Sequence, residues 1–79
     1  MEIKIVGPSC VNCLKLELHV AQVLKELGRE AEIIKVAEEK KISQFPETPP
    51  ILLIDGQLVH AGLPLPARDR IMQWISQRG

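Results

Sequence analysis

The chain has 79 residues, which is enough for one domain but not for two. Ten basic and ten acidic residues cancel, and no basic stripe indicates DNA, RNA or anionic lipid as a partner. Phe45 and Trp74 are the two aromatic residues, which argues against binding of single-stranded nucleic acid by stacked rings. We therefore expect a single domain, residues 1–79, that is monomeric and binds neither nucleic acid nor membrane.

The first half of the chain has the pattern of a strand, a long helix and a second strand. Isoleucines alternate with charged residues in residues 1–6, as in a strand with one buried face. A helix is predicted over residues 10–27, with Ser9 as its N-cap, and a strand over residues 31–36. The helix between them favours a parallel pair of strands. The apolar side of the helix is expected to hold Cys13, Leu16, Val20, Val23, Leu24 and Leu27, widened by Leu14 and Leu18.

A short helix and a buried strand are predicted next. Residues 38–43 are charged and favour the short helix, whereas the prolines within residues 46–50 force an extended backbone. Residues 51–54 are a continuous apolar run, which is typical of a central strand buried on both faces.

Asp55-Gly56 predicts a tight hairpin into a more polar edge strand at residues 57–61. Residues 67–77 then have the pattern of an amphipathic helix. The order β-α-β-(short α)-β-β-α predicts an α/β domain with a four-stranded mixed sheet and helices packed on its faces.

Cys10 and Cys13 are the two cysteines. The apolar run before Gly7 is too short for a signal-peptide core or a membrane span, so we expect a cytoplasmic protein. A stable structural disulfide is uncommon in that compartment, and two cysteines cannot form a disulfide framework. The pair is therefore predicted to be catalytic, redox-sensing or metal-binding.

The position of the pair at the start of a helix, directly after a strand, favours redox chemistry. Amides without intrahelical partners and the positive end of the helix dipole stabilise a thiolate on Cys10, so its pKa is expected to be lowered. Cys13 lies one turn further, on the apolar side, and is expected to be more protected. This predicts Cys10 as the nucleophile and Cys13 as the thiol that resolves the mixed disulfide.

Three segments together resemble a known family. They are Gly7-Pro8-Ser9-Cys10-Val11-Asn12-Cys13, the helix end Glu26-Leu27-Gly28, and Pro50-Ile51-Leu52-Leu53-Ile54-Asp55-Gly56. They look like the small archaeal and bacterial thioredoxin-like, glutaredoxin-sized redox-disulfide proteins, and the resemblance runs nearly end to end. It implies a minimal thioredoxin fold and a protein-disulfide oxidoreductase without a cofactor. Its implied partners are protein disulfides and an unidentified reductase.

The resemblance also implies a cis-proline that faces the cysteine pair, six residues before the hairpin glycine. Counting back from Gly56 gives Pro50, so the Pro49–Pro50 bond is predicted to be cis. Thr48–Pro49 is the competing choice, and two trans prolines that stiffen a loop are a further alternative. The backbone beside Pro49 and Pro50 is implied to pair with an incoming peptide as an added strand. Gly62 matches a glycine that lets substrate approach closely, although an ordinary turn glycine explains it equally well.

The chain departs from true thioredoxins in three ways. No Trp precedes Cys10, Val11-Asn12 separates the cysteines in place of Gly-Pro, and Lys4 stands six residues before Cys10 in place of a buried acid. Lys4 is interpreted as a surface residue rather than a group under the thiols. The glycine-rich glutathione-binding signal is incomplete at Gly62, so no glutathione-dependent enzyme is predicted.

Two other functions fit the cysteine pair. A soft-metal module would bind Cu(I) or Zn through Cys10 and Cys13, although copper-chaperone-like domains of this kind finish on a strand rather than a helix. A non-catalytic thioredoxin-like domain would use the thiols as a redox switch, and the sequence hardly separates it from an enzyme. No other residue is predicted as a metal ligand.

Overall fold

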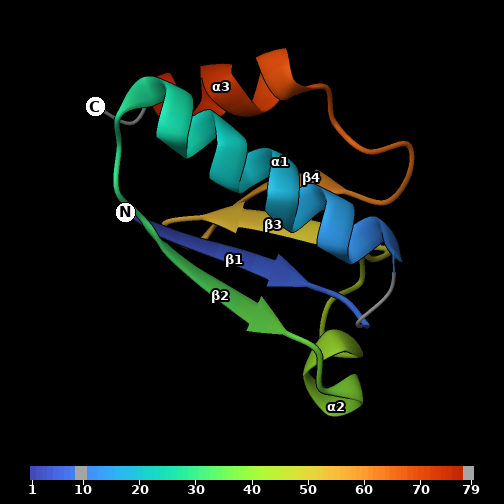
Figure 1. The fold of residues 1–79 in the computed structure, drawn as a ribbon. Helices are drawn as coiled ribbons and strands as arrows, with labels where there is room; N and C mark the ends of the chain where they lie inside the picture. Colours follow the sequence, from blue (N-terminus) through green and yellow to red (C-terminus); the bar gives the residue numbers. More distant parts are fainter. Residues whose placement is uncertain (9–10, 78–79) are drawn as a thin grey trace.

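Four strands form one mixed sheet in the computed structural model, which describes residues 1–8 and 11–77. The strand β1 (Glu2–Val6) pairs in parallel with β2 (Glu32–Val36) and antiparallel with β3 (Ile51–Ile54). The hairpin partner of β3 is β4 (Gln57–Ala61), so the order across the sheet is β2-β1-β3-β4 (Figure 1). This confirms the predicted α/β fold with a mixed sheet, and it places β4 at an edge.

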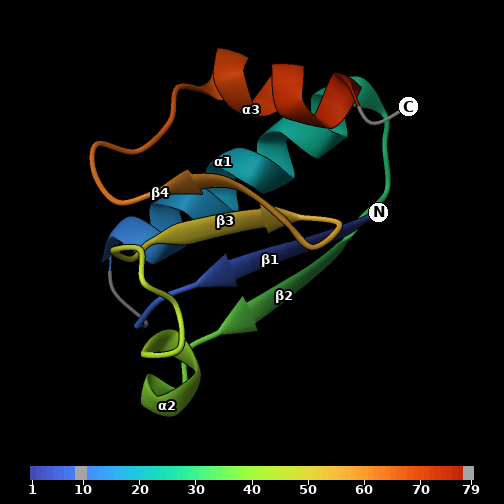
Figure 2. The same ribbon diagram turned by 180° about the vertical axis from the view of Figure 1, so that it is seen from behind.

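Two helices lie side by side on one face of the sheet. The long helix α1 (Val11–Leu27) crosses β1 and packs against α3 (Arg68–Ser76), as the two opposite views show (Figures 1 and 2). The short helix α2 (Glu39–Ile42) lies beyond the end of β2, away from α1. The predicted N-cap Ser9 and the predicted first helical residue Cys10 fall outside the described residues. Within the described part of the chain, no helix has the length and apolar character needed to cross a bilayer.

Side chains of β1 and β3 alternate between two apolar cores, because successive strand residues point to opposite faces. The larger core lies under α1 and α3. The smaller core lies on the opposite face, where Ile42 of α2 and Phe45 of the following loop pack against it. The helix-covered core holds Ile3, Ile5, Leu16, Val20, Val23, Leu24, Leu52, Ile54, Ile71 and Ile75, and the smaller core holds Val6, Ile51 and Leu53. Every residue of β3 is buried, as its uninterrupted apolar run predicted.

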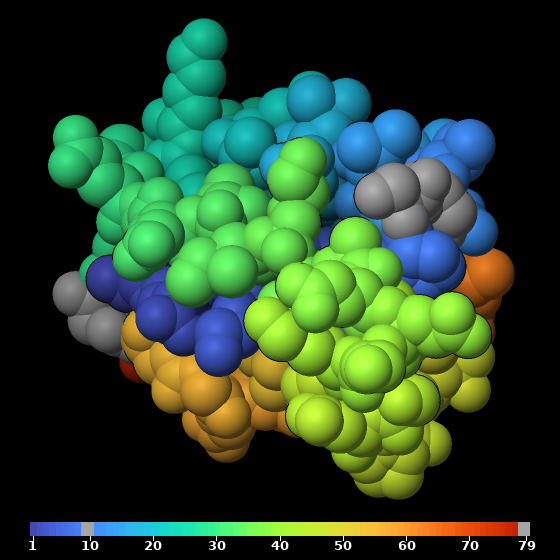
Figure 3. All heavy atoms as spheres, turned by 90° about the horizontal axis from the view of Figure 1, so that it is seen from below, coloured from blue at the N-terminus to red at the C-terminus, as the bar shows by residue number. Residues whose placement is uncertain are grey.

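The face on the α2 side is only partly covered. Figure 3 looks onto it and shows α2 and its following loop beside the exposed side chains of β1 and β2. An open hollow there is bordered by Lys4, Val36 and Phe45, among others. Lys4 therefore lies on the face opposite the helix-covered core, about 41% exposed and paired with Glu2, which agrees with its interpretation as a surface residue.

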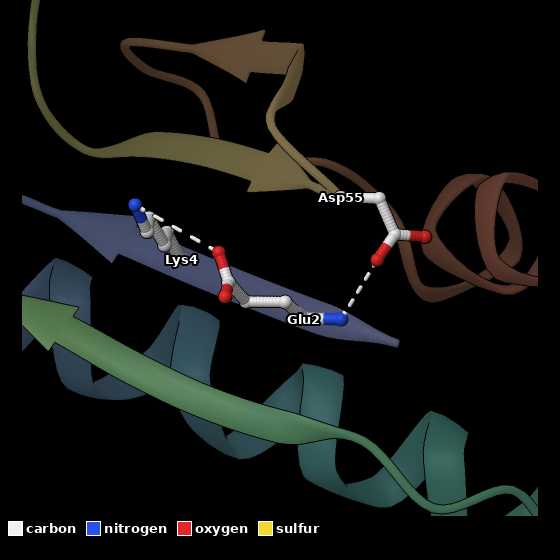
Figure 4. Close-up of polar contacts among 3 residues, drawn as sticks. All are labelled: Glu2, Lys4 and Asp55. Atoms are coloured by element: carbon white, nitrogen blue, oxygen red, sulfur yellow. Dashed lines mark hydrogen bonds and ion pairs between the residues drawn. The ribbon is translucent and has the colours of Figure 1, made fainter.

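The β3–β4 hairpin is tied to the start of β1. Asp55 and Gly56 both have φ in the left-handed region, at 51° and 81°, as the tight two-residue turn requires. The Glu2 N–H donates to Asp55 Oδ1 over 2.8 Å, and the Asp55 N–H donates to the Glu2 carbonyl over 2.7 Å. Figure 4 shows the side-chain bond, together with the Glu2–Lys4 ion pair of 3.7 Å.

One expectation about α1 is wrong. Leu14 and Leu18 do not widen its buried side, since they are 54% and 56% exposed. A domain of this size places only α3 beside α1 on the sheet, so the outward side of α1 has nothing to pack against.

Candidate thiol site

Cys13 is the third residue of α1 and points inward from its first turn. Its side chain is 8% exposed, so the predicted protection of this cysteine is confirmed. It borders a hollow of about 40 Å³ whose other lining residues are Ile5, Gly7, Pro8, Leu14, Lys35 and Ala37. Cys10, the predicted nucleophile, falls outside the described residues. It directly precedes Val11, the first residue of α1.

Gly7 ends β1 against the Cys13 thiol. A Cβ added to Gly7 would lie 2.7 Å from Cys13 Sγ, closer than real Cβ atoms approach any neighbour. Its N–H donates to the Val36 carbonyl over 2.9 Å, which holds this backbone in the sheet. The thiol therefore packs against backbone that carries no side chain. From the sequence, Gly7 was predicted only to end a strand, so this role was not predicted.

The loop that contains Pro49 and Pro50, which we call the proline loop, lies on another side of Gly7. The position of that added Cβ is 3.4 Å from Pro49 Cβ and 3.7 Å from Pro50 Cα. The Pro49–Pro50 peptide bond is cis, which confirms the predicted choice over Thr48–Pro49. A second cis bond, Leu63–Pro64, was not predicted. The fold thus brings the prolines to Cys13 with Gly7 between them.

Gly62 is joined to this loop by its backbone. Its N–H donates to the Pro50 carbonyl over 2.9 Å, and a Cβ added to it would lie 3.8 Å from the Thr48 carbonyl oxygen. Its φ of +80° is in the left-handed region that favours glycine. His60 Nε2 lies 3.0 Å from the Gly62 carbonyl oxygen, so this ring also supports the loop. The predicted substrate-binding residues Pro49, Pro50 and Gly62 are therefore neighbours.

Lys35 supplies the charge that borders the thiol hollow. It comes from β2, and its Nζ lies 3.4 Å from Glu17 Oε2 on α1, four residues after Cys13. Its side chain is 58% exposed, so solvent screens it. From the sequence, Lys4 was the lysine considered for this position, and Lys35 was not predicted. The only available signal was a lysine near the end of a predicted parallel strand, which was too weak to identify it.

The described residues hold no obvious metal centre. Across residues 1–8 and 11–77, no group of three or more His, Cys, Asp or Glu side chains could hold a metal ion. What these residues do assemble is a protected thiol, a cation at its edge, and a proline loop joined to a glycine turn. Such an arrangement suits thiol chemistry on a polypeptide substrate.

Comparisons with known proteins agree with this geometry. A family model described as "Thioredoxin domain" matches residues 1–76. A thioredoxin of Methanothermobacter thermautotrophicus is 41% identical over 59 residues, covering 73% of this chain and 77% of that protein. The structure is also similar to that of thioredoxin 1 from Thermosipho africanus, with a TM-score of 0.60 and 16% identity, over 99% of this chain and 93% of the other. The last similarity concerns the fold alone.

Proposed function

Because this chain belongs to the thioredoxin family, we propose that it reduces protein disulfides through a dithiol–disulfide cycle of Cys10 and Cys13. Family membership supports a thiol–disulfide oxidoreductase in general. The observation that carries the finer proposal is the burial of Cys13 against Gly7, beside the cis Pro49–Pro50 bond. A buried second thiol is suited to resolving a mixed disulfide rather than to attacking a protein from solution.

The proposed cycle has two exchange steps. The Cys10 thiolate attacks one sulfur of the substrate disulfide, which forms a mixed disulfide and releases the other sulfur as a thiolate that takes up a proton. Cys13 then loses its proton and attacks Cys10 Sγ, which releases the second substrate thiol and leaves a Cys10–Cys13 disulfide. Two electrons pass from the protein to the substrate, and an external dithiol donor restores the reduced pair.

Substrate binding is proposed at the proline loop. Pro49 and Pro50 lie against Gly7, which lines the Cys13 hollow, and Gly62 is hydrogen-bonded to Pro50. An extended peptide laid along this loop would have its disulfide close to the thiols. The partners of the proposed enzyme are protein disulfides and a reductase of unknown identity.

Insulin reduction driven by dithiothreitol tests the proposal. The wild type is expected to accelerate it, Cys10→Ser to abolish the acceleration, and Cys13→Ser to accumulate a mixed disulfide visible by mass spectrometry. A redox titration of the wild type should show one reversible two-electron transition that both variants lack.

Other outcomes would point elsewhere. Absence of a reversible transition would contradict the proposal. Tight stoichiometric Cu(I) binding by the reduced protein without turnover would favour a soft-metal module. A reversible transition with no turnover of any disulfide substrate would favour a redox switch.

A further inference from the structure

Three large apolar side chains form an exposed stripe on the outward side of α1. Val11, Leu14 and Leu18 are 65%, 54% and 56% exposed, and we call them the α1 stripe. Their spacing of three and four residues places them in one line along the helix, about 10 Å from first to last. Isolated exposed apolar residues are common, but a contiguous line of them indicates a binding surface.

The α1 stripe is continuous with the thiol site. Val11 stands between the two cysteines in the sequence, and Leu14 lines the hollow that Cys13 borders. A protein that delivers a disulfide to these thiols would therefore also cover the stripe. The inference accordingly rests on the proposed function.

The charges along the stripe favour an acidic partner. Lys15 is exposed on α1 between Leu14 and Leu18, and it forms no ion pair with another described residue. Lys25, also exposed and without an ion pair among the described residues, lies about two turns beyond Leu18 along the same helix. The acidic residues Glu17 and Glu26 are instead neutralised by Lys35 and Arg68. The unpaired charge around the stripe is thus positive, which complements acidic side chains on an incoming surface.

The size of the stripe favours a transient partner over a second copy of this chain. Three partly exposed side chains offer far less than the roughly 800 Å² per partner that a stable interface buries. Redox encounters are among the smallest specific interfaces. We propose that the α1 stripe is a docking surface for a protein redox partner whose apolar patch, beside its reactive disulfide, is ringed by acidic residues.

Two synthetic peptides test this docking surface. Each has a single cysteine that is blocked by the same small thiol in a mixed disulfide. One carries leucines and glutamates on both sides of the cysteine, and the other carries glutamines and lysines. The wild type is expected to reduce the acidic apolar peptide with a kcat/KM roughly tenfold higher, the ratio that one buried leucine provides.

Leu18→Gln removes apolar contact and Lys15→Glu reverses the charge beside the stripe, so each should lower that preference severalfold. Neither residue lines the Cys13 hollow, so the effect reports on docking. The matched controls are Leu58→Gln, an exposed apolar residue on β4, and Lys40→Glu on α2. Both controls should keep the wild-type preference, and Lys15→Glu should also make the peptide preference less dependent on salt.

Each remaining outcome overturns the inference. A wild type that reduces both peptides equally, or variants that keep the preference, would remove the docking surface but leave the proposed function intact. A wild type that reduces neither peptide would overturn the proposed function and this inference with it. A stable dimer in sedimentation equilibrium that Leu18→Gln dissociates would assign the stripe to a second copy of the chain.

Discussion

At the scale of single residues, the thiol site depends on Gly7 having no side chain. Gly7 lets Cys13 Sγ and the Pro49–Pro50 loop approach the same stretch of backbone. The space that a methyl group would need is already filled by sulfur on one side and by proline carbon on another. Cys13 burial and the position of the proline loop are therefore linked through one residue.

Substituting Gly7 tests this link. Gly7→Ala is expected to lower the free energy of unfolding by about 1–3 kcal/mol under reducing conditions, because the added methyl overlaps Cys13 Sγ. In a Cys13→Ala background the sulfur is absent, and Gly7→Ala should lower the free energy of unfolding by clearly less. Urea unfolding of the four proteins measures the coupling. An equal loss of free energy of unfolding in both backgrounds would show that the added methyl and the Cys13 sulfur do not compete for the same space.

Lys35 and Glu17 should act on the thiol in opposite directions. Lys35→Met removes the ammonium at the edge of the hollow and should raise the pKa of Cys13, an effect kept small by solvent screening. Glu17→Gln leaves that ammonium unpaired and should lower the pKa. Thiolate absorbance of a Cys10→Ser protein as a function of pH measures both, with Lys15→Met as the control. Shifts of the same sign in the two variants would contradict this assignment.

At the scale of secondary-structure elements, the β3–β4 hairpin is held by its turn and by its bond to β1. Asp55 supplies both, because it adopts a left-handed conformation and accepts the Glu2 N–H (Figure 4). Aspartate and asparagine tolerate that conformation better than alanine does.

Asp55→Ala is therefore expected to lower the free energy of unfolding by about 1–2 kcal/mol, through the lost hydrogen bond and the less favourable φ. Asp55→Asn keeps an acceptor oxygen and the tolerance for positive φ, so its cost should stay near 0.5 kcal/mol. Thermal and urea unfolding compare the two. An alanine variant as stable as the asparagine variant would mean that the tie to β1 contributes nothing.

At the scale of the whole molecule, stability depends on how α3 is attached to the rest. Ile71 and Ile75 place it in the helix-covered core, and Trp74 packs against that core from its edge. The Arg29 guanidinium, in the connection between α1 and β2, donates to the Ile75 carbonyl oxygen over 2.5 Å. Carbonyl groups in the last turn of a helix lack intrahelical partners, so this cation satisfies one of them.

Arg29→Ala is expected to lower the free energy of unfolding by about 1–2 kcal/mol, since it leaves that carbonyl without its charged donor. Arg70→Ala, an exposed residue on α3 itself, should change it by less than about 0.5 kcal/mol. Amide hydrogen exchange would show which part of the fold responds, and protection lost across α3 is expected for Arg29→Ala. Unchanged α3 protection in that variant would separate Arg29 from the attachment of the helix.

Local patterns predicted the elements well, and the cis bond came from family resemblance. The apolar run of β3 and the Asp55-Gly56 turn are signals contained in a few consecutive residues. What failed or was missed involves contacts between distant segments. Periodicity identified Leu14 and Leu18 as apolar, but it could not reveal that nothing packs against them. The meeting of Gly7 with Cys13, and of Lys35 with Glu17, also required the folded chain, and the role of Cys10 stays a prediction.

The hydrogen bonds between Asp55 and Glu2 also mark the end of the sheet at which the protein can be attached to a surface. They lie where β1 begins, whereas Gly7 lines the Cys13 hollow where β1 ends, roughly 17 Å away along the strand. A tether attached at the exposed Gln57, the first residue of β4, would anchor the protein to a bead or an electrode by the end remote from its thiols. The reactive end would then face the solution, and an immobilised reagent of this kind would present every copy in the same orientation.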